Sequence, residues 1–323
     1  MKSRPLLAVA ALGGTISMAP AERGVVPKLT AADLLDGVDL DFDVVAATLS
    51  TIPGTSLTFT GLTSCYEWAV AQRSDGIVVV QGTDTLEETA YFFECVWPDH
   101  RPVVLTGAMR HPSMLSPDGP ANLANALTVA AAPSSRGRGA LLAFNDDIHQ
   151  ARWVRKAHSS HLEAFSSAPA GPVGMLAEGA VHYFHPAGPR LPALPAPRTD
   201  LLIPVLESGL DDSGAVLDAV VEAGAAGVVV AASGVGHVSD RMADAIERAL
   251  TRVPVVVASR TGVGTTFRGT YGYRGAEADL IGMGVTMAGW LDPRKARVLL
   301  HLVLAAGMSV PAEFRLRGAV KGS

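Results

Sequence analysis

Cysteine is scarce in this 323-residue sequence, and no run of lysine or arginine occurs. Cys65 and Cys95 have no partner at the spacing of a metal site or a redox motif, so we expect buried, reduced thiols. Charged residues make up only 18% of the chain, and the formal net charge is −5. Nucleic-acid binders display a basic patch, so we expect a small neutral or zwitterionic ligand and no nucleic-acid partner.

Long apolar stretches are also missing. No segment reaches the roughly 18 apolar residues that cross a bilayer without an interruption by charge, glycine or proline. The first apolar run, Leu6–Leu12, follows a short basic start, as in a signal peptide, but it is too short and leads into Gly13-Gly14-Thr15 instead of a cleavage site. The sequence therefore predicts a buried first strand, a cytoplasmic location and no membrane partner.

The sequence does contain short apolar runs rich in Val, Ile and Leu, which alternate with amphipathic stretches. Several runs end in Gly or Thr, which is typical of parallel strands joined by crossover helices. The predicted strands are Leu6–Leu12, Asp43–Leu49, Gly76–Gln81, Pro102–Gly107, Gly139–Asn145, Gly227–Ala232 and Val253–Ser259, and the predicted helices are Thr85–Cys95, Asp118–Ala131, Asp212–Ala223 and Ser239–Leu250. This pattern predicts an α/β protein with a doubly wound, mostly parallel sheet.

A proline-rich segment divides this pattern in two. Residues 186–200 contain five prolines, which forbid a helix and disfavour a central strand, so we expect a stiff linker. It separates a larger N-terminal domain, residues 1–185, with the mostly parallel sheet, from a smaller C-terminal α/β domain, residues 201–323, with its own parallel sheet. The length of the chain also favours two domains.

Polar residues follow two of the predicted strands, and open parallel sheets bind ligands at the carboxyl ends of their strands. Gly13-Gly14-Thr15 follows the first strand, where the glycines permit a close approach of the backbone and Thr15 presents a hydroxyl. A glycine-rich segment after a strand is an ordinary turn roughly four times as often as it is part of a ligand site. Gln81–Thr85 closes the third strand, and its Asp84 either caps the next helix or accepts a hydrogen bond from an α-ammonium group.

Two further polar segments follow later strands. Residues 106–110, Thr-Gly-Ala-Met-Arg, precede Ser116, Asp118 and Asn122, an arrangement that a tight turn and a capped helix also explain. The pair Asn145-Asp146 precedes Lys156. A lone lysine on a polar stretch is usually solvated, at odds of about 10 to 1.

Together these segments resemble the bacterial-type L-asparaginase/glutaminase family over almost the whole chain. Leu12–Ile16 is similar to the family's Gly-Gly-Thr-Ile segment, and Gly82–Thr85 to its Gly-Thr-Asp-Thr segment. Lys156 matches a lysine that follows an Asn-Asp pair in the family. Other similar segments are Thr106–Arg110, Ser116–Leu123, Gly234–His237, Ser259–Gly262 and Lys295–Leu300.

The resemblance implies a threonine-dependent amidohydrolase that needs no metal and no organic cofactor. Thr15 would attack the amide carbon and form an acyl-enzyme that water then cleaves, although spacing alone does not decide which threonine attacks. A neutral Lys156 would take a proton through Thr83, and Asp84 would hold the α-amino group of the substrate. Backbone N–H groups near the two threonines would stabilise the oxyanion. Substrate contacts are expected at Gly14, Thr55, Ser56, Gly82 and Ala108.

Two positions depart from the family pattern. Relatives carry a tyrosine on a mobile loop soon after the first threonine, but no tyrosine occurs between residues 16 and 35. Glu22, Tyr271, Tyr273 or a residue of a neighbouring subunit is the hypothesised substitute. Gly54 stands where relatives have a serine that binds the α-carboxylate, and losing such a buried hydrogen bond costs about 1–3 kcal/mol.

The sequence therefore predicts an enzyme that hydrolyses the side-chain amide of L-asparagine to aspartate and ammonia. An altered specificity for D-asparagine, glutamine or a metabolite amide is one alternative, and a non-catalytic amino-acid-binding relative is another. The presence of all four of Thr15, Thr83, Asp84 and Lys156 favours catalysis. A dehydrogenase is disfavoured because Gly234-x-Gly236 lacks the third glycine of the dinucleotide motif.

The resemblance also implies a homo-oligomer, either a dimer or a tetramer of dimers. The C-terminal domain would contribute to the subunit interface, and active sites would be completed across it. His237 stands where many relatives have an asparagine at the subunit contact. A packing role and a functional role are about equally expected for this histidine.

Overall fold

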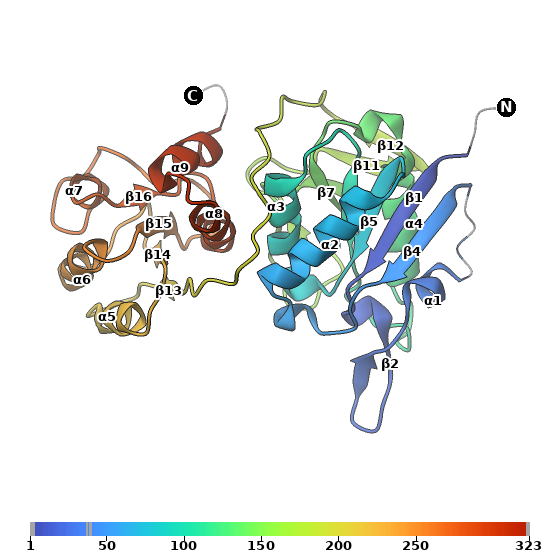
Figure 1. The fold of residues 1–323 in the computed structure, drawn as a ribbon, viewed down its shortest axis with the longest axis horizontal. Helices are drawn as coiled ribbons and strands as arrows, with labels where there is room; N and C mark the ends of the chain where they lie inside the picture. Colours follow the sequence, from blue (N-terminus) through green and yellow to red (C-terminus); the bar gives the residue numbers. More distant parts are fainter. Residues whose placement is uncertain (1–3, 37, 39–40, 321–323) are drawn as a thin grey trace. The chain divides into compact units, whose positions relative to one another are not determined.

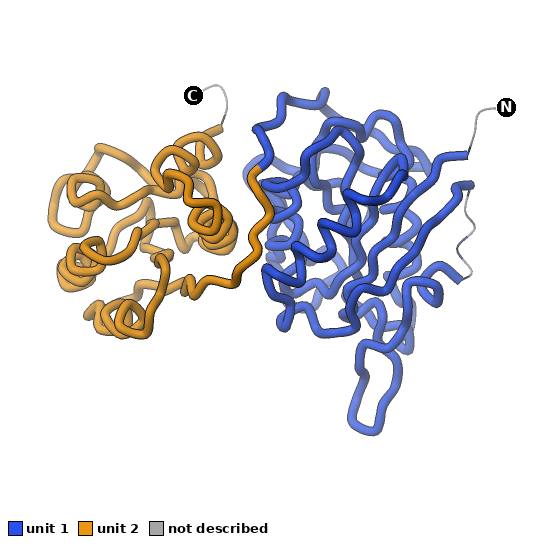
Figure 2. Tube along the Cα trace, in the orientation of Figure 1, with its two compact units in different colours: residues 1–193 blue, residues 194–323 orange. Residues whose placement is uncertain are grey.

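The computed structural model describes residues 4–36, 38 and 41–320, so the outer limits of the predicted domains at residues 1 and 323 lie outside the described residues. The chain divides into two compact units, Met1–Ala193 and Leu194–Ser323 (Figure 2). Both units are α/β and contain parallel sheets, which confirms the predicted fold class. The assignment of residues 1–185, 186–200 and 201–323 as domain, linker and domain stays a prediction.

Unit 1 is built around an eight-stranded sheet with the strand order β12-β11-β8-β7-β6-β5-β1-β4 (Figure 1). Its parallel part consists of β1 (Leu6–Ala11), β4 (Asp43–Thr48), β5 (Gly76–Val80), β6 (Val103–Thr106) and β7 (Ala140–Phe144). It continues antiparallel through β8 (Asp147–Gln150), β11 (Gly174–Ala177) and β12 (Ala180–Tyr183). Strands β5, β6 and β7 are buried along their whole length, which is why they are continuous apolar runs.

Helices cover both faces of this sheet. On one face lie α1 (Ala31–Leu35) and α4 (Gly119–Ala131), and Leu123 and Leu127 of α4 pack there with Val9, Val78 and Val104. On the other face lie α2 (Phe59–Ala71) and α3 (Leu86–Val96) (Figure 1). The smaller elements are the hairpin of β2 (Met18–Pro20) and β3 (Val25–Pro27), the pair β9 (Arg155–Lys156) and β10 (Phe165–Ser166), and the 3-10 turns η1 (Thr15–Ser17), η2 (Gly54–Ser56), η3 (Thr83–Thr85) and η4 (Pro133–Ser135).

The order of the parallel strands reverses at β1. Strand β4 pairs with one edge of β1, and β5, the next long strand in the sequence, pairs with its other edge. In open α/β sheets such a reversal leaves a crevice at the carboxyl ends of the two central strands. The crevice therefore lies where β1 leads into Gly13-Gly14-Thr15 and β5 leads into Gln81–Thr83.

Unit 2 contains a four-stranded parallel sheet of order β13-β14-β15-β16. Its strands are β13 (Val205–Glu207), β14 (Val228–Ala232), β15 (Val255–Ser259) and β16 (Thr286–Met287), and its helices are α5 (Ala215–Glu222), α6 (Asp240–Leu250), α7 (Glu277–Gly282), α8 (Pro293–Ala305) and α9 (Val310–Gly318). Apolar side chains of α5 and α6, including Leu217 and Ile246, pack with Val228, Val230 and Val255 of the sheet. Among the described residues, no helix is both long and apolar enough to cross a membrane.

Candidate active site

Three glycines bring the ends of β1 and β5 into contact with the η2 turn. A Cβ atom on Gly14 would lie 2.1 Å from the Cα atom of Gly82, and a Cβ atom on Gly82 would lie 3.5 Å from the backbone nitrogen of Gly54. Gly14 also has a φ of 88°, a conformation that other residues rarely adopt. Glycine is therefore required at position 14. Thr15 follows directly, so its backbone begins the η1 turn beside Gly82.

Lys156 joins the two polar residues that follow β5. Its Nζ donates hydrogen bonds to Thr83 Oγ1 at 2.9 Å and to Asp84 Oδ1 at 2.7 Å. Thr83 is 3% exposed, whereas the side chain of Asp84 is 63% exposed. A buried hydroxyl in contact with an amine can relay a proton, and an exposed carboxylate can hold a cationic ligand group.

The Thr15 hydroxyl has no hydrogen-bond partner within residues 4–36, 38 and 41–320. Hydrogen bonds therefore link three of the four predicted catalytic residues, and Thr15 is brought to them only through its backbone. The turn that carries Thr15 is fixed by Ser17, whose hydroxyl donates to the Gly14 carbonyl oxygen at 2.9 Å. An unpartnered hydroxyl at the carboxyl end of a strand is available to a substrate. The catalytic roles of these residues stay predictions.

A buried carboxylate holds the backbone of Lys156. The Lys156 N–H donates a short hydrogen bond to Glu87 Oε2, and Glu87, in the first turn of α3, is only 1% exposed. No role for Glu87 was predicted from the sequence. One feature could have indicated a role for it, namely a glutamate on the buried side of a helix next to the Gly82–Thr85 segment. A buried charge is retained where it has a specific partner.

Gly54 is held by a second hydrogen-bond relay. Gln81 Nε2 donates to Thr85 Oγ1 at 3.0 Å, and Thr85 Oγ1 donates to the Gly54 carbonyl oxygen at 2.9 Å. A Cβ atom on Gly54 would lie only 3.1 Å from Thr85 Oγ1, so a serine would crowd this contact. Thr55 and Ser56, which follow on η2, are exposed.

Gln81 Oε1 is buried without a hydrogen-bond partner among the described residues. Buried acceptors are normally satisfied, so this oxygen offers a place for an ordered water or a donor group of a ligand beside Gly54. Neither Gln81 nor Thr85 was predicted as a site residue from the sequence, because their roles depend on the approach of Gly54 from a distant segment.

The Ser116–Leu123 segment supports the loop that follows β6. The Asp118 carboxylate accepts hydrogen bonds from the N–H groups of Met109 at 2.9 Å and Arg110 at 2.8 Å. Asn122 Nδ2 donates to the Gly107 carbonyl oxygen at 3.0 Å. The segment therefore fixes the loop around Ala108, which has no exposed surface.

Asn145 and Asp146 form the tight turn between β7 and β8. Their φ angles are 50° and 65°, as in the two-residue turns that join antiparallel strands. The Asn145 N–H donates to Asn122 Oδ1 at 3.0 Å. The Asn-Asp pair thus has a structural role in unit 1.

In unit 2, the two tyrosines considered as substitutes for the missing one gather around His237. His237 Nδ1 lies 2.9 Å from Tyr273 Oη, and its Nε2 lies 2.8 Å from Glu277 Oε2. Burial raises the pKa of Glu277, but hydrogen bonds from the N–H groups of Tyr271, Glu277 itself and Thr270 and from His237 outweigh it and hold that pKa below its usual range. Tyr271 and Tyr273 are 44% and 55% exposed, so the cluster faces outward from unit 2.

Within the described residues, no cluster of three or more His, Cys, Asp or Glu side chains is arranged to hold a metal ion. Glu22, the other hypothesised substitute, lies exposed in the turn between β2 and β3. The hydrogen bonds that join Lys156 to Thr83 and Asp84 are compatible with proton transfer between side chains.

Family models match both halves of the chain. The model of the N-terminal asparaginase domain matches residues 6–188, and that of the glutaminase/asparaginase C-terminal domain matches residues 203–315. A probable L-asparaginase of Deinococcus radiodurans is 38% identical over 314 residues, which are 95% of each chain. L-asparaginase 2 of Escherichia coli is 35% identical over 238 residues, covering 72% of this chain and 67% of that protein.

A solved structure has the same fold across both units. The crystal structure of a probable cytoplasmic L-asparaginase from Campylobacter jejuni matches with a TM-score of 0.86 and 29% identity, over 98% of this chain and 99% of that one. The fold, the polar residues at its strand ends and these matches define an enzyme of the amidohydrolase class. The chain belongs to the asparaginase family, which confirms the family predicted from the sequence.

Proposed function

We propose that this chain hydrolyses the side-chain amide of L-asparagine to aspartate and ammonia. The observation that carries the proposal is the pair of hydrogen bonds from Lys156 Nζ to Thr83 and Asp84, at the strand end that contacts the Thr15 turn. The names of the Deinococcus and Escherichia relatives support asparagine as the substrate.

In the proposed reaction, Thr15 Oγ1 attacks the amide carbon. Its proton passes through the Thr83 hydroxyl to the Lys156 side-chain nitrogen and then to the leaving nitrogen, so that the C–N bond breaks and ammonia departs. Water attacks the resulting ester by the reverse proton path and releases aspartate and Thr15. Backbone N–H groups near Thr15 and Thr83 stabilise the oxyanion, and the exposed Asp84 carboxylate binds the α-ammonium group.

The remaining contacts with the substrate follow from the glycine cluster. Gly14 and Gly82 contact the substrate through their backbone, because neither has a side chain, whereas Ala108 has no exposed surface and makes no such contact. The hydroxyls of Thr55 and Ser56 bind the α-carboxylate, in place of the side chain that Gly54 lacks. Activity on D-asparagine, glutamine or a metabolite amide is the second candidate, and the glycine at position 54 is the feature that favours it.

We also propose a homo-oligomer, as a dimer or a tetramer of dimers, in which unit 2 contributes to the interface. The exposed cluster of Tyr271, Tyr273 and His237 would complete the active site of a neighbouring subunit and replace the tyrosine missing from the β2–β3 hairpin. Gel filtration checks this, and a mass equal to one chain of 33.4 kDa would contradict it. A cytoplasmic location is proposed, and the similar Campylobacter structure, which is that of a probable cytoplasmic L-asparaginase, supports it.

Ammonia release from L-asparagine, D-asparagine, L-glutamine and D-glutamine tests the proposed reaction. We expect the parent to prefer L-asparagine and Thr15→Ala and Lys156→Met each to lower kcat on the order of 10³-fold or more. Lys28→Met, which removes an exposed lysine, is the matched control and is expected to retain the parent rate. A folded parent that releases no ammonia from any of the four would overturn the proposal in favour of a binding protein.

A further inference from the structure

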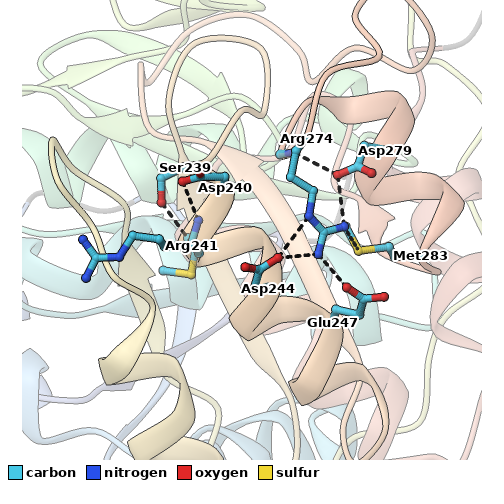
Figure 3. Close-up of polar contacts among 10 residues, drawn as sticks. Ser239, Asp240, Arg241, Asp244, Glu247, Arg274, Asp279 and Met283 are labelled. Carbon is cyan, nitrogen blue, oxygen red and sulfur yellow. Dashed lines mark hydrogen bonds and ion pairs between the residues drawn. The ribbon is translucent and has the colours of Figure 1, made fainter.

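Most arginines of unit 2 have a partner. Arg274 is the extreme case, because its guanidinium donates to Asp244 and Glu247 and lies 3.5 Å from Asp279 (Figure 3). The hydrogen bonds to Asp244 and then Glu247 raise the pKa of Arg274. Arginines that likewise contact a carboxylate or a carbonyl oxygen are Arg241, Arg248, Arg252, Arg260, Arg297 and Arg317.

Arg268 and Arg315 are the exceptions. Neither makes a hydrogen bond or an ion pair with any residue in the described part of the chain. They come from separate elements, since Arg268 lies in the loop between β15 and α7 and Arg315 lies on α9. Nevertheless both line the same two cavities, of about 240 Å³ and about 460 Å³.

The linings of these cavities contain no carboxylate among the described residues. Two exposed arginines thus line the same cavities with no carboxylate among the described lining residues, so their guanidinium donors are available to an anion. The larger cavity adds the hydroxyl-bearing residues Thr265 and Thr266 and the ring of Trp290.

The floor of the larger cavity is rigid. A Cβ atom on Gly289 would lie 2.5 Å from the Gly318 carbonyl oxygen, so the end of α9 packs directly against the segment after β16. Thr266 is 4% exposed, and its Oγ1 accepts a hydrogen bond from the Gly289 N–H at 3.0 Å. These contacts hold the cavity open independently of the two arginines, as a preformed ligand site requires.

We propose that the cavity of about 460 Å³ lined by Arg268 and Arg315 binds a small dianion, either a dicarboxylate or a phosphate group. A guanidinium presents a planar fork of donors that matches both carboxylate and phosphate oxygens. The volume of this cavity suits a metabolite rather than a macromolecule. The site lies within unit 2 and shares no residue with the proposed active site, so it is a second ligand site.

Isothermal titration calorimetry of the full chain tests the proposal, with inorganic phosphate and succinate as separate probes. We expect saturable binding of at least one probe, and the double variant Arg268→Gln/Arg315→Gln is expected to weaken it at least about tenfold, because each charge-assisted contact is lost. Arg241→Gln/Arg248→Gln, which removes the same charge from exposed ion pairs of the same unit, is the matched control and should change the Kd less than about twofold.

The two probes distinguish the two anion sources, because phosphate binding without succinate binding identifies a phosphate site and the converse identifies a dicarboxylate site. Titration of Lys156→Met separates this site from the active site, since binding that depends on the arginines persists there. Equal binding by the parent and the Arg268→Gln/Arg315→Gln variant, or no saturable binding at all, overturns the proposal. A lower gel-filtration mass for that variant also overturns it, because the arginines would then bind a second copy of the chain.

Discussion

The position of Lys156 depends on two carboxylates that act on different parts of the residue. Its Nζ contacts the exposed Asp84, while its backbone N–H is held by the buried Glu87. Lys156 lies on the two-residue strand β9, which pairs with the equally short β10. Glu87 is therefore a positioning residue, because it fixes the origin of the lysine side chain without contact to Thr83.

Replacing Glu87 tests this role. Glu87→Leu leaves the Lys156 N–H without an acceptor, and the resulting displacement of the lysine is expected to lower kcat about tenfold to a hundredfold. Glu87→Gln retains an oxygen acceptor and should recover most of the loss. Steady-state ammonia release measures both, and Glu67→Gln, an exposed glutamate on α2, is the control. An unchanged kcat in a folded Glu87→Leu variant would contradict the role.

Sequence patterns predicted the candidate site residues that follow strands but not the residues that hold them in position. Thr15, Thr83 and Asp84 were found because parallel strands collect polar residues at their carboxyl ends. Glu87 contacts the backbone of a residue 69 positions away, and Thr85 contacts the carbonyl oxygen of Gly54. Such contacts follow no local periodicity, so only the folded chain reveals them.

At the level of elements, α8 begins with a charged pair that is largely buried. Asp292 caps the helix by accepting hydrogen bonds from the N–H groups of Arg294 and Lys295, and Lys295 Nζ lies 2.6 Å from Asp292 Oδ2. The Lys295 side chain is 1% exposed. Burial raises the pKa of Asp292, but the charge of Lys295, the hydrogen bonds from its Nζ and N–H, and the charge of Arg294 together outweigh this effect, so that pKa lies below its usual range.

Removing the charge of Asp292 is expected to destabilise the chain. Asp292→Asn keeps a cap but leaves the Lys295 ammonium without this carboxylate, which costs about 3–5 kcal/mol when one partner of a buried pair is lost. Asp218→Asn breaks the exposed pair with Arg248 and is the control, with an expected cost of at most about 1 kcal/mol. Urea unfolding measures both. Equal losses in the two variants would show that the α8 pair behaves as a surface contact.

All seven predicted strands and four predicted helices are present, and their ends differ from the prediction by at most three residues. The central strands were predictable because burial on both faces makes them continuous apolar runs. The helices α1, α2, α7, α8 and α9 were not predicted, nor, within the large sheet of unit 1, were β8, β11 and β12. These three strands are short, and β11 and β12 alternate in burial along an antiparallel edge, so their apolar signal is weak.

At the scale of the whole molecule, acid stability depends on groups that fold in a neutral form. His149, on β8, is 2% exposed, and its Nδ1 lies 2.8 Å from Ser167 Oγ. Burial lowers the pKa of His149 to about 4, from 6.5. The folded unit 1 therefore resists protonation at a position where the unfolded chain accepts a proton.

The direction of the resulting pH effect follows from proton linkage. Between pH 6.5 and pH 4 the unfolded chain binds a proton at His149 that the folded chain does not bind, so acidification favours unfolding. The stability contributed by the neutral histidine is complete above pH 6.5 and declines as the pH falls, by about 3 kcal/mol at pH 4. Asp and Glu groups also make the free energy of unfolding depend on pH. Comparing a His149 variant with the parent cancels this contribution, because both chains carry the same Asp and Glu groups.

His149→Gln isolates this effect, because glutamine can keep a hydrogen bond to Ser167 and does not titrate. We expect the variant to lose less stability than the parent between pH 7 and pH 4, by about 3 kcal/mol, in urea unfolding followed at several pH values. His185→Gln, at an exposed position of the same unit, should follow the parent curve. Parallel curves for His149→Gln and the parent would show that His149 is protonated in the folded unit 1 and that the acid sensitivity of this unit arises elsewhere.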